Sequence, residues 1–203
     1  MATRGREKSH QTMLELMAAA EELFGRQGFA ATTVAEITRH AGYAKGSFYR
    51  HWPGKDQLFL AIVERKLKAY RAARDERIGQ AQGLADALNV IWDFLEGIAV
   101  DRQWAKVFLE FTVHAARDTG LRQELRKSQN RLSEQVFADL LRPFVGEGFP
   151  LEKIGALNTV LFEGFLVHNA LEINLLRLAD VREAAVTLAL AGIRSGGDEM
   201  GEA

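Results

Sequence analysis

Apolar positions recur at helical spacing along most of this 203-residue chain. Between residues 9 and 26 they fall at Met13, Met17, Ala20 and Phe24, a series that forms one face of an amphipathic helix. The pattern also predicts a long helix from Lys55 to about residue 79, and others at about 84–99, 102–117, 119–145, 151–177 and 180–194. With three prolines and no alternating β-branched run, the chain is predicted to be all-α, with about nine helices.

Residues 33–53 predict two short helices joined by a tight turn. Thr33 and Glu36 form a capping box, which marks a helix start. Gly42 closes that helix, because the left-handed residue of such a turn is most easily glycine. A second short helix follows at residues 44–51, and Pro53 prevents it from continuing. This arrangement predicts a helix-turn-helix, whose second helix enters a DNA major groove.

The outer face of the second helix suits DNA. Donors for phosphates and base edges are crowded together there: Lys45, Ser47, Tyr49, Arg50 and His51. Gly46 costs this helix about 1 kcal/mol relative to alanine, which a helix tolerates where its backbone must approach another surface closely. A solvated helix with an incidental glycine explains any one of these residues. The set, together with the cap, the turn glycine and the proline, favours DNA binding.

Residues 10–65 also resemble the N-terminal domain of TetR-type transcriptional regulators. The resemblance lies in Glu22-Leu23-Phe24, Gly28-Phe29, Thr32-Thr33-Val34-Ala35-Glu36-Ile37, Ala41-Gly42-Tyr43, Lys45-Gly46-Ser47-Phe48-Tyr49, His51-Trp52-Pro53 and Lys55. Three positions depart from the family pattern. Ala44 replaces a usual serine cap of the recognition helix, Trp52 replaces a phenylalanine and Gly54 replaces a serine. The lost caps imply some fraying of the helix, but not a different fold.

The residue types and the resemblance together predict a set of DNA-binding residues. Its members are Thr32, Thr33, Tyr43, Lys45, Gly46, Ser47, Tyr49, Arg50, His51 and Lys55. We expect Thr33, His51 and Lys55 to hold the DNA backbone. Lys45 and Tyr49 are expected on the backbone and also near base edges, where Ser47 should join them.

Composition narrows the function further. The absence of cysteine excludes disulfides, thiol catalysis and thiolate zinc sites. Residues 1–68 hold 11 Lys and Arg against 7 Asp and Glu, a net of +4, whereas residues 69–203 hold 15 against 20, a net of −5. A basic head on an acidic body suggests that only the head meets a polyanion. No signal peptide and no apolar run near the roughly 20 residues of a membrane span are present, so we expect a cytoplasmic protein without a membrane partner.

The region after residue 84 is rich in aromatic side chains at helical spacing. Such stripes are ordinarily core, but the resemblance implies a pocket for a small-molecule effector among these helices. The predicted lining consists of Trp92, Trp104, Phe108, Phe111, His114, Phe162, Phe165 and Asn169. Other polar residues in these helices are candidates as well: Glu110, Ser128, Asn158 and Glu163. For each one alone, a surface position or an internal hydrogen bond is the simpler explanation.

The last two predicted helices indicate self-association. Residues 151–178 are apolar in nearly every direction, so this helix must be covered on two sides. A central helix of the monomer core would satisfy the same pattern. We favour a symmetric homodimer, in which two recognition helices would face major grooves about 34–36 Å apart. Its predicted interface consists of Leu157, Leu161, Val167, Leu171, Ala184, Leu188 and Ala191.

These patterns predict four segments: a flexible arm at 1–8, a helix-turn-helix DNA-binding domain at 9–65, an effector-binding and dimerisation domain at 66–195, and a disordered tail at 196–203. Near residues 66–78 the long helix turns polar and predicts a solvated connector. Catalysis is not expected, because the five histidines are scattered and no phosphate-binding Gly loop or nucleophile elbow is present.

The sequence therefore predicts a homodimeric, ligand-responsive regulator without cofactors, a repressor that binds a palindromic double-stranded operator. An alternative is a small-molecule-binding module whose head mediates protein interaction.

Overall fold

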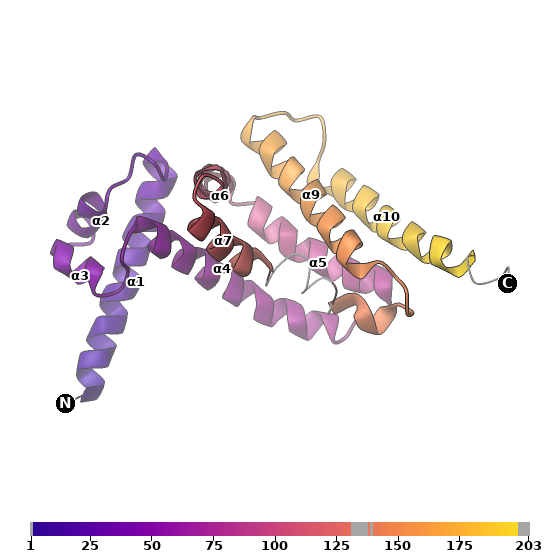
Figure 1. Cartoon of the computed structure of the whole chain (residues 1–203), viewed down its shortest axis with the longest axis horizontal. Helices are drawn as coiled ribbons and strands as arrows, with labels where there is room; N and C mark the ends of the chain where they lie inside the picture. Colours follow the sequence, from indigo (N-terminus) through magenta and orange to yellow (C-terminus); the bar gives the residue numbers. More distant parts are fainter. Residues whose placement is uncertain (1, 131–137, 139, 199–203) are drawn as a thin grey trace. The chain divides into compact units, whose positions relative to one another are not determined.

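A computed structural model describes residues 2–130, 138 and 140–198, and these residues are helical without any strand (Figure 1). The all-α prediction is confirmed. The elements are α1 (Ala2–Gln27), α2 (Val34–His40), α3 (Lys45–Tyr49), α4 (Lys55–Ile78), α5 (Leu84–Ala99), α6 (Arg102–Ala115), α7 (Thr119–Asn130), the 3₁₀ helix η1 (Arg142–Phe144), α9 (Leu151–Ala170) and α10 (Leu178–Asp198). Within this described part, no helix is long and apolar enough to cross a bilayer.

The chain divides into two compact units. The N-terminal unit comprises Met1–Lys66 together with Val107–Leu125, and the second unit comprises Leu67–Lys106 together with Arg126–Ala203. The prediction assigned all of residues 66–195 to the C-terminal domain. In the structure, residues 107–125 group with the N-terminal unit, because the second part of α6 packs on the aromatic core of that unit.

That aromatic core organises the N-terminal unit. Phe24, Phe29 and Phe59 meet pairwise with ring centroids 5.3–5.8 Å apart, and all three are essentially inaccessible to solvent. Each buried ring or large aliphatic chain contributes about 1.5–3 kcal/mol. The same core includes Leu16, Ala20, Ile37, Phe48, Leu58, Ile62 and Phe111.

The second unit is built around α5, α9 and α10. Helix α10 packs against both α5 and α9 (Figure 1), and the core between the elements of this unit includes Leu88, Ile91, Leu141, Ile154 and Ala189. The buried Trp92 donates its indole N–H to Asn158 Oδ1 at 3.0 Å, and the Asn158 amide donates to the Ile154 carbonyl at 2.8 Å. Asn158 is therefore satisfied internally rather than open to a ligand.

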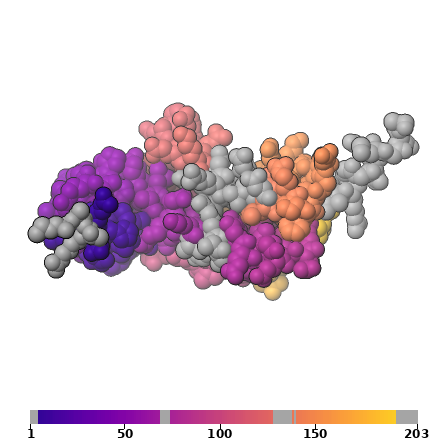
Figure 2. Space-filling view, turned by 90° about the horizontal axis from the view of Figure 1, so that it is seen from below, coloured from indigo at the N-terminus to yellow at the C-terminus, as the bar shows by residue number. Residues whose placement is uncertain are grey.

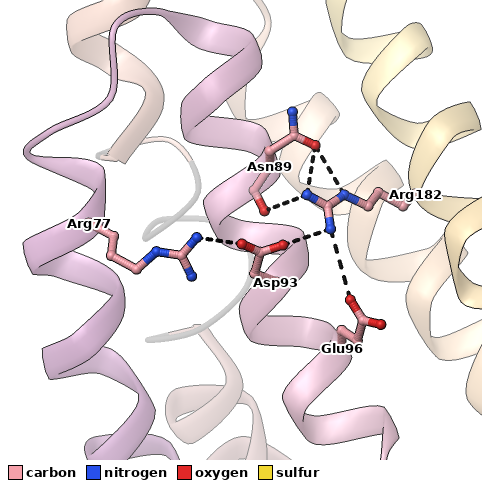
Figure 3. A network of polar contacts seen from close by, with 5 residues as sticks. All are labelled: Arg77, Asn89, Asp93, Glu96 and Arg182. Carbon is pink, nitrogen blue, oxygen red and sulfur yellow. Dashed lines mark hydrogen bonds and ion pairs between the residues drawn. The ribbon is translucent and has the colours of Figure 1, made fainter.

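A polar network fixes α10 to α5 and to the end of α4 (Figure 3). The Arg182 guanidinium donates to Asn89 Oδ1 at 2.9 and 3.0 Å and to Asp93 Oδ1 at 2.7 Å. It also lies 3.9 Å from Glu96, while Arg77 donates to the second Asp93 oxygen at 2.5 Å. Burial raises the pKa of Asp93, but the hydrogen bonds from both arginines outweigh it and hold that pKa below its ordinary value.

Two helices differ from prediction at their ends. Helix α1 begins at Ala2, so residues 2–8, predicted as a flexible arm, extend the helix. Helix α9 ends at Ala170 instead of residue 177, because Glu172 adopts a left-handed conformation (φ 59°). The Ile173 amide then bonds back to the His168 carbonyl at 2.9 Å and closes the helix.

Other differences fall in the last third of the chain. Helix α10 continues to Asp198, into the predicted tail, and residues 199–203 of that tail lie outside the described residues. In the helix predicted at 119–145, residues 131–137 and 139 also lie outside them. The predicted solvated connector contains a buried charge: Arg74 is 6% exposed, with its guanidinium 5.5 Å from the Phe94 ring.

Candidate nucleic-acid interface

The helix-turn-helix is formed by α2, residues 41–44 and α3, and its start is fixed by local hydrogen bonds. The Thr33 hydroxyl accepts from the Glu36 amide at 3.2 Å, and the Glu36 carboxylate accepts from the Thr33 amide at 2.8 Å. The predicted capping box is therefore confirmed. The donated hydrogen bonds, first from the Thr33 hydroxyl and then from its amide, lower the pKa of Glu36. Gly42 has φ 75°, the left-handed turn residue that the sequence predicted.

Helix α3 is held by one buried side chain. Phe48 is inaccessible to solvent and packs against Trp52 with ring centroids 5.5 Å apart. The helix covers Lys45–Tyr49 and is shorter than predicted, because the His51 and Trp52 amides both bond to the Phe48 carbonyl and end it. Ala44 provides no side-chain cap, as its replacement of serine implied. The anchor leaves the rest of α3 directed to solvent.

The outward face of α3 brings together most of the predicted DNA-binding residues. Lys45, Gly46, Tyr49 and Arg50 are exposed. The Lys45 ammonium lies 5.9 Å from the Tyr49 ring centroid, and Arg50 donates to the Ser47 hydroxyl at 3.1 Å. A methyl group at Gly46 would meet no atom within 4 Å. Nothing in the N-terminal unit therefore requires a glycine here.

Two further predicted residues flank this face. Thr33 is exposed at the start of α2. His51 is partly buried just after α3, and burial lowers its pKa, as does the neighbouring Arg50 charge. Both effects favour the neutral imidazole, which offers one N–H as a donor.

Three predicted DNA contacts are engaged elsewhere in the N-terminal unit. Thr32 is fully buried and its hydroxyl donates to the Gly28 carbonyl at 2.7 Å, so its side chain is not available to DNA. The Tyr43 hydroxyl donates to the Glu15 carboxylate of α1. The Lys55 ammonium donates hydrogen bonds at 2.7–3.3 Å to three loop carbonyls, those of Phe29, Ala30 and Thr32.

The loop between α1 and α2 has a partner that sequence reasoning placed elsewhere. Glu110 of α6, considered above as a ligand-recognition candidate, accepts from the Phe29 and Ala30 amides at 2.8 Å each. No local pattern could reveal these contacts, because they join residues 81 and 80 positions apart. The one feature of the sequence that points to this loop is Gly28, a glycine that ends α1 in a left-handed turn (φ 87°).

The predicted effector-pocket residues are divided between the two units. Phe111 stacks on Phe59 with centroids 4.0 Å apart and meets Phe29 edge-on at 5.0 Å. His114 pairs with Asp56 at 3.2 Å. Phe111, His114 and Phe108 all belong to the N-terminal unit, whereas Trp92, Trp104, Phe162, Phe165 and Asn169 belong to the second. Phe111 thus lies in the core of the N-terminal unit, and His114 lies at the surface of that unit.

The predicted dimer residues lie on α9, directly after it and on α10, and most of them are exposed. Leu157, Val167, Leu171 and Leu188 are 38–66% exposed, which is unusual for large aliphatic side chains on paired helices. Ala184 and Ala191 are exposed as well, and Leu161 is half-buried. The orange segment near residue 150, where α9 begins, is visible at the surface in the space-filling view (Figure 2). Val160, which the prediction omitted, is 63% exposed on the same helix.

Comparison with known proteins identifies the family. Residues 16–62 match the sequence model of the bacterial regulatory proteins of the tetR family. The N-terminal domain is therefore of the tetR type. The match covers the second half of α1, the helix-turn-helix and the start of α4.

Similar proteins of known name are transcriptional regulators. The HTH-type transcriptional regulator YfiR of Bacillus subtilis is 26% identical over 144 residues, 70% of each chain. AcrR of Shigella flexneri, also an HTH-type transcriptional regulator, is 26% identical over 65% of this chain and 62% of its own. FadR of Thermus thermophilus, a TetR-family repressor solved with lauroyl-CoA, has a TM-score of 0.70 and 22% identity over 89% of this chain and 94% of its own. The chain described here has the same fold as that repressor.

Proposed function

We propose that this TetR-family regulator represses transcription by binding a palindromic operator as a homodimer, and that a small apolar or aromatic effector releases it. The observation that carries the proposal is the outward face of α3. Exposed donors surround a glycine whose missing side chain no part of the N-terminal unit explains. A backbone that must approach a DNA duplex closely accounts for both features.

Within this proposal the residues have distinct roles. Lys45, Ser47 and Tyr49 of α3 would reach base edges, while Thr33 and His51 would hold phosphates on either side. Arg50 would add a further phosphate contact. Because phosphate contacts supply most of the affinity, binding should fall steeply with salt. We assign Lys55 to the loop carbonyls instead, since burial lowers its pKa and its donors already have partners.

The exposed surface of α9 and α10 supports the homodimer. Large aliphatic side chains at 38–66% exposure become buried if two copies meet through this surface. A two-fold axis through such an interface would present two copies of α3 to successive major grooves, about 34–36 Å apart. The two-fold symmetry of such a dimer is what makes the operator palindromic, and the spacing sets the separation of its half-sites. We place the regulator in the cytoplasm, where its DNA lies.

For the effector, we propose an apolar or aromatic small molecule bound in the second unit. FadR of Thermus thermophilus has been solved with lauroyl-CoA, and the second unit here contains Trp92 packed edge-on against Phe162 at 6.3 Å. Burial raises the pKa of Glu163, which lies beside Phe162. An effector would release DNA only to the extent that it binds the DNA-free state more tightly.

A titration by fluorescence anisotropy tests the DNA-binding proposal. Labelled duplexes from the DNA flanking the gene are titrated with protein at low ionic strength, and then at rising salt. We expect one duplex to bind at least a hundredfold more tightly than a scrambled duplex, with log affinity falling linearly against log salt. If every duplex binds as weakly as the scrambled one, the head serves protein interaction and the proposal is wrong. Compounds that raise the melting temperature are then tested for release of the bound duplex.

A further inference from the structure

The loop from Gly28 to Thr32, which leads directly into the helix-turn-helix, is held from both polar edges of its backbone. Its amides at Phe29 and Ala30 donate to the Glu110 carboxylate, one to each oxygen, at 2.8 Å. Its carbonyls accept from the Lys55 ammonium at 2.7–3.3 Å. Glu110 belongs to α6 and Lys55 belongs to α4. Two helices therefore hold one loop through opposite charges.

Gly28 is shaped to receive the carboxylate. Its φ of 87° suits glycine, and a Cβ at this position would lie 3.0 Å from one Glu110 oxygen and 3.5 Å from the other. Successive amides in such a turn form a concavity that binds anions. Here the anion is supplied by the chain itself. The left-handed glycine and the acid 82 residues later in the sequence fit each other.

The two holding helices also extend beyond the N-terminal unit. Residues 107–115 of α6 lie in that unit and residues 102–106 in the second. Helix α4 divides in the same way after Lys66. Both holding helices therefore continue past the unit that contains the loop. Phe111 and His114 secure α6 to Phe59 and Asp56 and also meet the Phe29 ring, whereas Glu110 bonds to the loop backbone itself.

We propose that Glu110 is a positioning residue, through which α6 fixes the loop and so holds the helix-turn-helix in its DNA-binding orientation. The loop ends at Thr33, the cap of α2, so its position sets where α2 and then α3 begin. This inference rests on the proposed function, because orientation matters only if α3 binds DNA. It does not depend on which effector acts.

The test compares Glu110→Gln with Glu124→Gln. Glu124 is an exposed acid on α7 in the same unit, so the control removes the same charge without touching the loop. In Glu110→Gln, one amide faces an NH₂ group and loses its acceptor. We expect hydrogen exchange of the Phe29 and Ala30 amides to become about tenfold faster in Glu110→Gln and to stay at the wild-type rate in Glu124→Gln.

Binding provides the second readout, on full-length protein. With the duplex found by anisotropy, we expect Glu110→Gln to bind about tenfold more weakly than Glu124→Gln. In the wild type, the duplex should also slow amide exchange in residues 102–106 of α6, and this slowing should disappear in Glu110→Gln. If Glu110 merely stabilised the unit, Glu110→Gln would lower the melting temperature but would leave intact the slowing of amide exchange that DNA causes in residues 102–106.

The outcomes separate the two proposals. If the wild type binds no duplex, the proposed function fails and this inference fails with it. If the wild type binds but Glu110→Gln matches Glu124→Gln in exchange, affinity or DNA-linked slowing, only the role of Glu110 is overturned. Should Glu110→Gln not fold, Glu110→Asp replaces it: the carboxylate is kept but is shorter by one methylene. Wild-type affinity and exchange in that variant would equally overturn the inference.

Discussion

Gly46 provides the sharpest test of the DNA-binding surface, because Gly46→Ala should have opposite effects on stability and on affinity. The added methyl would meet no atom of the free protein within 4 Å, and the backbone of α3 at this position is helical. The substitution therefore introduces no clash in the unbound protein. What changes is the intrinsic preference of α3 for the helix.

The gain in stability can be estimated from helix propensity. Alanine is favoured over glycine by about 0.5–1 kcal/mol, and the lower part of that range applies to the first turn of a short helix. In a chain of this size, about 1 kcal/mol corresponds to about 2–4 °C in melting temperature. We expect Gly46→Ala to melt one or two degrees higher than the wild type.

The loss of affinity follows from the proposed close approach of DNA to α3. Forcing a methyl into a well-packed contact costs about 1–3 kcal/mol. At about 1.4 kcal/mol per factor of ten, each half-site would weaken about tenfold. A homodimer carries the change twice, so the operator as a whole should bind about a hundredfold more weakly.

Calorimetry and anisotropy on the same preparation measure both effects. Gly120→Ala is the matched control: Gly120 is also the second residue of a helix, α7, and its added methyl would make an ordinary 3.4 Å contact with Asp118. We expect that variant to bind DNA like the wild type. Unchanged operator affinity in Gly46→Ala, with the melting temperature raised, would refute the reasoning, because it would show that DNA does not approach this part of α3.

Three further variants test other parts of the account. Tyr49→Ala removes a ring that is 50% exposed beside Lys45; operator affinity should fall about tenfold with dimerisation unchanged by analytical ultracentrifugation, and normal affinity would remove Tyr49 from the interface. Leu188→Asp should give a monomer at micromolar concentration, while Val113→Asp, at an exposed position on α6, should remain a dimer; a dimeric Leu188→Asp would place the interface elsewhere. Asp93→Asn should lower the free energy of unfolding at pH 7 by about 1 kcal/mol, discounted for 32% exposure. Because the folded pKa of Asp93 is lowered, this difference should be present above pH 3.8 and vanish as the pH falls through the lower folded value; a difference that persisted in acid urea titrations would contradict the role of the ion pairs.

Local signals accounted for the helix-turn-helix. The capping box at Thr33 and Glu36, the left-handed Gly42 and the stop before Pro53 each act within a few residues, so the sequence contains what is needed to locate α2 and α3. The end of α9 is different. Glu172 takes the left-handed conformation that glycine usually takes, and nothing in the neighbouring residues indicates it.

Contacts distant in sequence explain the features that the sequence did not indicate. Phe111 sits at helical spacing with Trp104 and Phe108, which suggested a pocket, yet its ring stacks on Phe59. Hydrophobic periodicity indicates which face of a helix is buried, but not which partner buries it. In the same way, Lys55 matched the family motif for a DNA contact, and only the fold shows its ammonium held by three loop carbonyls.

The assignment of residues 107–125 to the N-terminal unit has a practical consequence for chimeric regulators. A graft that joins residues 1–66 to a foreign sensor would leave behind Glu110 and Phe111. The transplanted piece would expose the Phe29 and Phe59 rings to water and lose the acceptor for two amides. A successful hybrid must therefore import the matching turn of α6 along with the head, or choose a recipient whose own helix offers an acid and an aromatic ring at the same places.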